Sequence, residues 1–113
     1  MSVRIEARLW WAQRVTAAFL AFFVAVHLAT IIYAVHAGLS AAEVLARTRG
    51  SLAWAIFYAL FVLAASAHGA IGLRTVAAEW LRWRGASANG AVALIALALA
   101  LLGLRAVAAV TFP

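Results

Sequence analysis

Residues 52–73 read LAWAIFYALFVLAASAHGAIGL and contain no aspartate, glutamate, lysine or arginine. A helix needs roughly 20 apolar residues to cross the hydrocarbon core of a bilayer. The stretch is therefore predicted to be a transmembrane helix, with an amphipathic cytoplasmic extension that brings it to 52–83. Two similar stretches flank it: residues 15–37, VTAAFLAFFVAVHLATIIYAVHA, and residues 91–112, which are interrupted by one charge at Arg105.

The composition of the whole chain supports a membrane protein. Of its 113 residues, 69% are hydrophobic and 11% are charged, and the mean hydropathy is +1.08. A soluble domain is roughly half apolar and about a quarter charged, so an ordinary soluble enzyme is excluded. The absence of cysteine excludes a secreted disulfide scaffold. We predict an all-α membrane protein, with three transmembrane helices in a single domain over residues 1–113.

The connections between the predicted helices contain residues that stop helices. Residues 38–51 are expected to form a loop, and residues 85–90, GASANG, a turn. The first apolar stretch is not expected to be a cleaved signal peptide, because its apolar core exceeds the 7–15 residues that such a region uses and it contains two histidines.

The basic residues indicate how the chain is oriented. All nine cations are arginines and the net charge is +6. They lie at the ends of apolar runs rather than in one patch, so membrane flanks are favoured over nucleic-acid binding. Six fall on one predicted side and three on the other: Arg4, Arg8, Arg14, Arg74, Arg82 and Arg84, against Arg47, Arg49 and Arg105. The positive-inside rule then places the N-terminus in the cytoplasm and the C-terminus outside. Four of the five tryptophans fall on the cytoplasmic side, which we expect to meet a partner.

Three histidines, His27, His36 and His68, lie within the apolar helices or at their ends. Ionisable residues inside a membrane are costly and usually functional. A membrane histidine can instead simply hydrogen-bond a neighbouring helix. His36 lies near a predicted helix end, where an interfacial role is expected.

His68 has the more informative neighbours. Ala64, His68 and Gly72 are four residues apart and therefore share one helical stripe. Small residues one turn above and below an imidazole leave a flat wall on which a macrocycle could lie, and close helix packing is the alternative explanation of such a stripe. Arg74 follows six residues later, about 9 Å along the axis. It could meet the carboxylates of a haem whose iron binds His68.

The segment from His68 to Arg74, HGAIGLR, resembles the H-x-x-x-G-[LI]-R signature of the second transmembrane helix in the cytochrome b membrane-anchor subunit of succinate dehydrogenases and fumarate reductases. Glu79 and Trp80 resemble the acidic and aromatic positions that follow it. Residues 13–17, QRVTA, resemble the H-R-x-[ST]-G of the family's first helix. The resemblance covers roughly residues 10 to 110.

The resemblance implies specific roles. His68 would be the axial ligand of a haem b iron, with Gly72 packing against the haem and Arg74 beside its propionates. Arg14 and Thr16, with Gln13, would lie near a quinone site. The chain departs from the family pattern at three positions: Gln13 replaces histidine, Trp10 replaces a frequent serine, and Ala17 replaces glycine.

The positions of His27 and His68 argue against one shared haem. His27 lies 13 residues from Arg14, about 20 Å along a helix, whereas His68 lies about 9 Å from Arg74. A depth difference of roughly 10 Å is too large for two ligands of one iron unless the helices tilt strongly. His27 is therefore a candidate ligand of a second haem, as in the family's two-haem branch, or a residue that hydrogen-bonds a neighbouring helix.

The resemblance also implies a respiratory complex in the bacterial cytoplasmic (inner) membrane. The chain would be part of a larger helical bundle with a second membrane-anchor subunit, and it would carry electrons between an iron–sulfur subunit, paired with a flavoprotein subunit, and quinone. It has no catalytic constellation of its own. A haem-free structural anchor is the alternative. A small multidrug-type transporter is disfavoured, because all three glutamates lie in flanks or loops.

Overall fold

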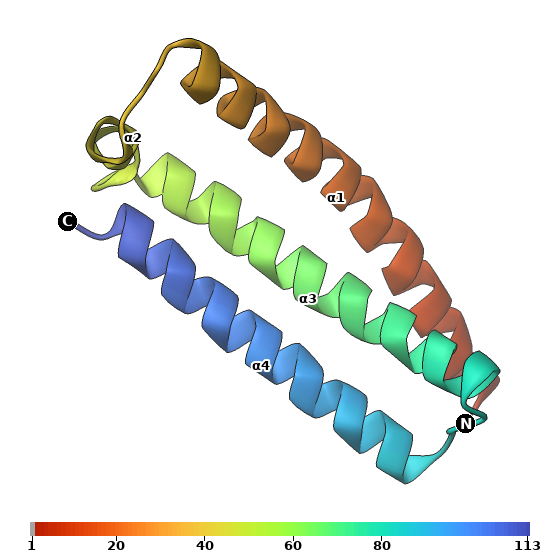
Figure 1. Cartoon of the computed structure of the whole chain (residues 1–113). Coiled ribbons are helices and arrows are strands. Elements are labelled where there is room, and N and C mark those ends of the chain that lie inside the picture. Colours follow the sequence, from red (N-terminus) through yellow and green to blue (C-terminus); the bar gives the residue numbers. More distant parts are fainter. Residues whose placement is uncertain (1) are drawn as a thin grey trace.

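The computed structural model describes residues 2–113, and their regular secondary structure is entirely helical (Figure 1). Three of the helices are long and apolar enough to span a membrane, which confirms the predicted all-α membrane fold. The four helices in chain order are α1 (Val3–His36), α2 (Ala41–Thr48), α3 (Leu52–Trp80) and α4 (Ala86–Thr111).

Helix α1 begins twelve residues before the predicted membrane span. Ser2 caps it, because its side chain accepts a hydrogen bond from the Ile5 amide at 3.4 Å. No glycine or proline interrupts the next 34 residues, so the helix continues through the charged flank into the apolar run. At 1.5 Å per residue α1 is about 50 Å long, well over the roughly 30 Å of the hydrocarbon core.

The predicted loop between the first two spans is wrong in its middle, where the chain forms α2. Ser40 and Glu43 make a reciprocal capping box: the Glu43 amide donates to the Ser40 hydroxyl at 3.2 Å, and the Ser40 amide donates to the Glu43 carboxylate at 2.6 Å. The bond from the Ser40 amide lowers the pKa of the Glu43 carboxyl below its usual range. Gly38 and Gly50 flank α2 with φ angles of +66° and +74°, which favour glycine.

The predicted turn at residues 85–90 is also corrected. Helix α3 ends at Trp80, three residues before the expected boundary, and Arg82 has a φ of +52°. The chain reverses over residues 81–85, and Gly85 precedes α4 with a φ of +91°. The GASANG stretch therefore contributes most of its residues to the first turns of α4 rather than to the turn.

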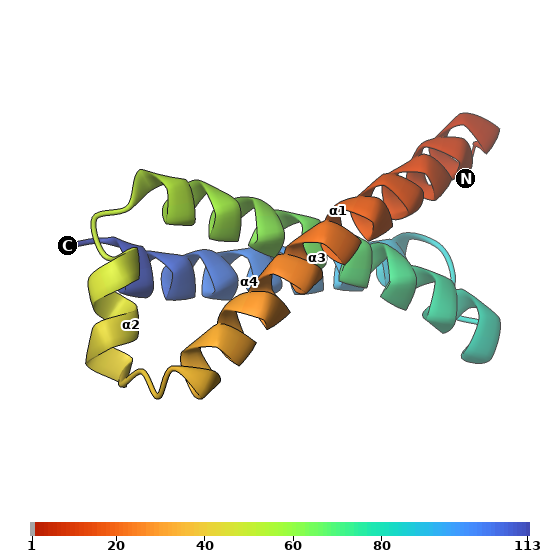
Figure 2. The same ribbon diagram turned by 90° about the horizontal axis from the view of Figure 1, so that it is seen from above.

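Helix α3 lies between the other two long helices. It runs side by side with α4 (Figure 1), whereas α1 crosses it at an angle (Figure 2) and stands away from the α3–α4 pair toward the end that holds α2. Packing of α3 on α4 is close at Gly103, where an added Cβ would overlap the Val62 side chain. At the α2 end, Thr48 donates to the Val110 carbonyl at 2.7 Å, and the Gly50 amide donates to the Thr111 carbonyl at 2.7 Å.

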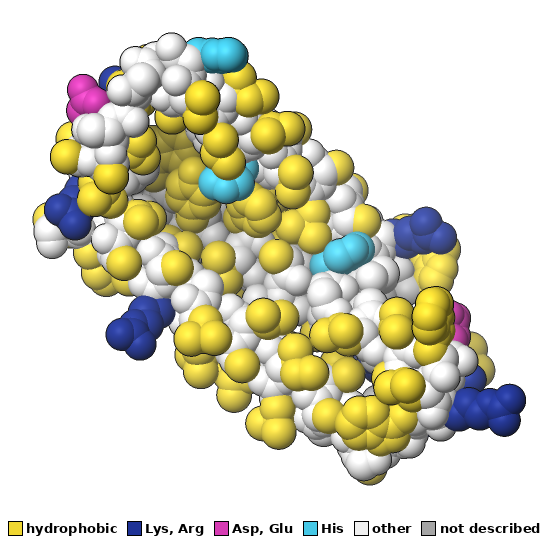
Figure 3. Space-filling model, in the orientation of Figure 1, with side chains coloured by type: hydrophobic (Ala, Val, Ile, Leu, Met, Phe, Trp, Pro, Cys, Tyr) yellow, Lys and Arg dark blue, Asp and Glu magenta, His cyan; other side chains and the backbone are white. Residues whose placement is uncertain are grey.

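The chain buries little of its apolar surface within itself. Among residues 2–113, the buried hydrophobic residues are one phenylalanine and three alanines: Phe23, Ala70, Ala77 and Ala88. Hydrophobic side chains are spread over the face seen in Figure 3, and histidine side chains are visible on the same face. Lipid tails are as apolar as leucine, so such a surface is stable in a bilayer or against other helices.

Candidate functional site

The contact between α1 and α3 brings together residues that the sequence analysis singled out separately. The Thr16 hydroxyl on α1 lies 3.2 Å from Nδ1 of His68 on α3. Both side chains are half-buried. The same hydroxyl lies 2.7 Å from the Ala12 carbonyl oxygen and 3.1 Å from that of Gln13. The predicted haem ligand and a predicted quinone residue therefore share one hydrogen bond.

One turn away, Gln13 faces Gly72. A Cβ built on Gly72 would lie 3.4 Å from Nε2 of Gln13, so the glutamine amide occupies part of the space beside Gly72 where we expected a macrocycle. Oε1 of Gln13 is buried and has no hydrogen-bond partner among the described residues. A buried, unpaired amide oxygen is costly, and it is a place where an added polar group would be stabilised.

Paired residues on α1 and α3 follow one antiparallel register. Thr16 pairs with His68, and His27 pairs with Tyr58, whose hydroxyl lies 3.3 Å from His27 Nδ1. Tyr58 precedes His68 by ten residues on α3. At helical rise this separates the levels of His27 and His68 by about 15 Å. The two histidines therefore lie at different levels of the α1–α3 contact, and that they do not share one haem stays a prediction.

His27 lies among aromatic rings. Its ring is edge-on to Tyr58, with centroids 5.6 Å apart, and to Phe61, at 5.7 Å. It lines a cavity of about 270 Å³ between α1, α2 and α3, and other lining residues include Trp54 and Arg47. The structure thus gives His27 the hydrogen-bond partner on a neighbouring helix that the sequence left open. Its role as a second haem ligand stays a prediction. His36 is exposed in the last turn of α1.

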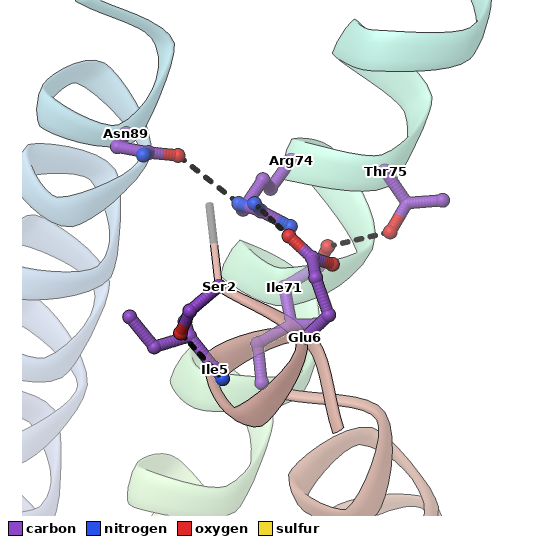
Figure 4. A network of polar contacts seen from close by, with 7 residues as sticks. All are labelled: Ser2, Ile5, Glu6, Ile71, Arg74, Thr75 and Asn89. Carbon is purple, nitrogen blue, oxygen red and sulfur yellow. Dashed lines mark hydrogen bonds and ion pairs between the residues drawn. The ribbon is translucent and has the colours of Figure 1, made fainter. Parts of the chain in front are cut away.

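Arg74 connects three helices at the opposite end of the bundle (Figure 4). Its Nη2 donates to the Glu6 carboxylate on α1 at 2.8 Å, and its Nε donates to Oδ1 of Asn89 on α4 at 3.0 Å. The Arg74 side chain is 22% exposed and that of Glu6 is 52% exposed. A polar cavity of about 460 Å³ opens beside them, lined in part by Glu79 and Arg84.

Arg14 does not join Gln13 and Thr16. It is exposed, and its guanidinium carbon lies 5.0 Å from the centroid of the Trp10 ring, which is a cation–π distance. The structure thus brings together Gln13, Thr16, His68 and Gly72, and it leaves Arg14 on a different face of α1.

Sequence reasoning did not identify the partners Tyr58, Glu6 and Asn89. Tyr58 sits in an aromatic run, where nothing distinguishes it from packing residues. Glu6 and Asn89 carried a signal that could have been used: a carboxylate and an amide within a turn or two of a membrane boundary, both on the side that holds Arg74. An arginine near the same level is a natural partner for either group.

The described residues offer single imidazoles rather than a cluster of metal ligands. Within residues 2–113, no three side chains of histidine, cysteine, aspartate or glutamate converge into a metal-binding group. His68 by itself offers one imidazole nitrogen. One imidazole fits an axial position of an iron that a porphyrin already holds in its plane.

Comparison with protein families identifies a family that covers most of the chain. The model described as succinate dehydrogenase/fumarate reductase transmembrane subunit matches residues 1–104. No curated protein and no solved structure matches the chain.

Proposed function

Because the chain belongs to the succinate dehydrogenase/fumarate reductase transmembrane subunit family, we propose that it is a haem b-binding membrane anchor that passes electrons between an iron–sulfur subunit and membrane quinone. This chain would anchor the complex in the membrane and conduct electrons. The partner subunits would carry out the dehydrogenase chemistry. In this proposal His68 is the axial ligand that this chain supplies.

The setting of His68 supports the haem assignment more than any other observation. The side chain lies in the apolar part of α3, half-buried, with one ring nitrogen occupied by Thr16. Metal-bound histidines usually engage their second ring nitrogen in such a bond, which fixes the orientation of the ring. The hydrogen bond to Thr16 would therefore fix the orientation of the His68 ring and leave its other ring nitrogen available to iron.

The residues of this chain would hold and insulate the group. A haem supplies a one-electron couple, whose potential depends on axial ligation, burial and nearby charge. His68 would provide the ligation, and the apolar side chains of α1 and α3 the low-polarity surroundings. Arg74, about 9 Å along α3 from His68, would place a positive charge toward the propionates.

For the quinone we propose a site beside Gln13, at the same end of the bundle. The buried and unpaired Oε1 of Gln13 could accept a hydrogen bond from a quinol hydroxyl, and its Nε2 could donate to a quinone carbonyl. Arg14 would border this site from the exposed face of α1, where its charge can act over a distance rather than by contact.

The same proposal includes the surroundings of the complex. The end of the bundle that carries six of the nine arginines and four tryptophans would face the cytoplasm and the iron–sulfur subunit. A second anchor subunit would pack on the apolar faces that α1, α3 and α4 leave exposed and supply the other axial ligand. The host membrane would be the bacterial cytoplasmic membrane.

The test is a dithionite-reduced spectrum of the purified complex. We expect the α-band of a b-type haem in the wild type and its loss in the His68→Leu variant. His36→Leu is the matched control, because His36 is exposed at the end of α1, and its spectrum should equal that of the wild type. A wild-type complex without haem would favour the structural-anchor alternative, and an unchanged spectrum in His68→Leu would overturn the assignment of this ligand.

A further inference from the structure

The hydroxyl of Thr16 has a single proton and three acceptors within reach. The nearest is the Ala12 carbonyl oxygen at 2.7 Å, followed by the Gln13 carbonyl at 3.1 Å and His68 Nδ1 at 3.2 Å. A hydroxyl-to-carbonyl distance of 2.7 Å is the usual length of an O–H···O bond. A threonine in a helix commonly donates to the carbonyl four residues earlier. The proton of Thr16 therefore lies on its own helix.

With that proton committed to Ala12, Thr16 can only accept from His68. A hydrogen bond at Nδ1 then requires that this nitrogen carry the ring proton. A neutral imidazole has one protonated and one unprotonated nitrogen. We infer that Thr16 is the positioning residue of His68, which holds it as the Nδ1-protonated tautomer with the lone pair of Nε2 available to iron.

This inference rests on the proposed haem site and changes the role of Thr16 within it. The family pattern implies a hydroxyl near quinone, whereas the geometry joins this hydroxyl to the haem ligand. A bond accepted from Nδ1–H makes the imidazole more electron-rich and fixes the angle of its ring. An electron-rich axial ligand stabilises oxidised iron, so the bond lowers the midpoint potential of the haem.

The experiment measures the midpoint potential of haem b in purified complexes that carry Thr16→Val, Thr16→Ala or Thr16→Ser. Valine keeps the shape of threonine and loses the acceptor, and alanine loses the acceptor without adding bulk. Serine keeps the acceptor. Thr75→Val is the matched control, because Thr75 also donates to the carbonyl four residues earlier, at 3.2 Å, but is exposed and contacts no histidine.

We expect Thr16→Val and Thr16→Ala to raise the midpoint potential, and Thr16→Ser and Thr75→Val to leave it unchanged. A neutral hydrogen bond changes such an equilibrium by about three- to tenfold, and a tenfold change in a one-electron couple is about 59 mV. The electron paramagnetic resonance signal of the oxidised haem should shift in the same two variants, because the ring loses its fixed angle.

Each other outcome has a distinct meaning. If the wild-type complex lacks haem, the proposed function itself fails. If haem is present and neither Thr16→Val nor Thr16→Ala changes its potential, the inference is wrong. A raised KM for quinone with an unchanged potential also overturns it and returns Thr16 to the quinone site. A shift in Thr16→Ser equal to that in Thr16→Val would mean that the methyl group, rather than the hydroxyl, positions the ring.

Discussion

Arg74 illustrates how one side chain can serve both the architecture and the electrostatics of the bundle. Its guanidinium donates to Glu6 and to Asn89, so it ties α3 to both neighbouring helices. The ion pair with Glu6 lies at an exposed end of the bundle, where solvent screens the two charges, so it adds little to stability. In the proposed complex, the two charges matter more for the midpoint potential of the haem than for stability. A cation and an anion beside a redox group change its potential in opposite directions.

We predict opposite shifts in haem potential for the two charges, given the haem site at His68. Arg74→Gln should lower the midpoint potential, because a nearby cation disfavours the oxidised haem. Glu6→Gln should raise it, because the remaining guanidinium is no longer balanced. At roughly 9 Å and an effective dielectric constant of about 20, shifts on the order of tens of millivolts are expected. Redox titration of both variants checks this. Arg105→Gln, at the α2 end of α4, is the control, and shifts of the same sign in Arg74→Gln and Glu6→Gln would contradict the prediction.

The role of His27 determines how many haems we expect in the proposed complex. If it ligates a second one, the ratio of haem b to covalent flavin in the purified complex is near two and falls to one in His27→Leu. Tyr58→Phe tests the bond between His27 and Tyr58 independently. It removes the hydroxyl that lies 3.3 Å from His27 Nδ1 and keeps the aromatic packing. A wild-type ratio of one that survives His27→Leu would reduce His27 to a residue that joins α1 to α3.

At the scale of the helix, periodicity and hydropathy predicted the three spans but not their ends. The charged flank of α1 is polar, so hydropathy excluded it, although Ser2 and an uninterrupted run of helix formers extend the helix through it. Helix α2 had a visible signal, the Ser40 and Glu43 capping box, which the glycines around it obscured. Gly85 precedes α4 and Gly90 lies in its first turns, and both are read as helix stops, but only Gly85 has a positive φ.

The packing of α3 on α4 supports a second prediction at this scale. Gly103→Ala should destabilise the pair by about 1–3 kcal/mol, because the new methyl group overlaps Val62 and forces a shift in a tight contact. Gly90→Ala is the matched control on the same helix, since a Cβ there meets nothing within 4 Å. Thermal unfolding of the full chain in detergent measures both variants.

A double variant makes this test sharper. Val62→Ala combined with Gly103→Ala should recover most of the lost stability, because it removes the side chain that the new methyl group meets. If Gly103→Ala is as stable as Gly90→Ala, the close approach of α3 and α4 at this level is not a determinant of stability.

For the whole molecule, the sequence predicted the candidate residues better than their contacts. His68 and Thr16 were both singled out, but they are 52 residues apart in sequence and meet only because of the crossing of α1 over α3. That register depends on the whole length of two helices and has no local signature. The grouping of charges was predictable, because the start of α1, the end of α3 and the start of α4 share one end of the bundle (Figure 1).

We predict that this arginine-rich end is cytoplasmic. The chain contains no cysteine, so single introduced cysteines report topology without background. In intact bacterial cells a membrane-impermeant maleimide should label Ala42→Cys, in α2, and should label Ala86→Cys, at the start of α4, only after the membrane is permeabilised. The reverse pattern of labelling would show that the chain is inserted the other way round.

Few of the described side chains are buried, and this has a consequence for the amount of the protein that a cell maintains. Within the part of the chain that the structure describes, Phe23 is the one large residue among the buried hydrophobic side chains, and the others are alanines. The stability of the chain therefore depends on lipid and on the helices that pack against it. In the proposed complex, copies made in excess of the partner subunits should be degraded by membrane proteases. We expect its steady-state amount to follow the supply of its scarcest companion subunit rather than its own rate of synthesis.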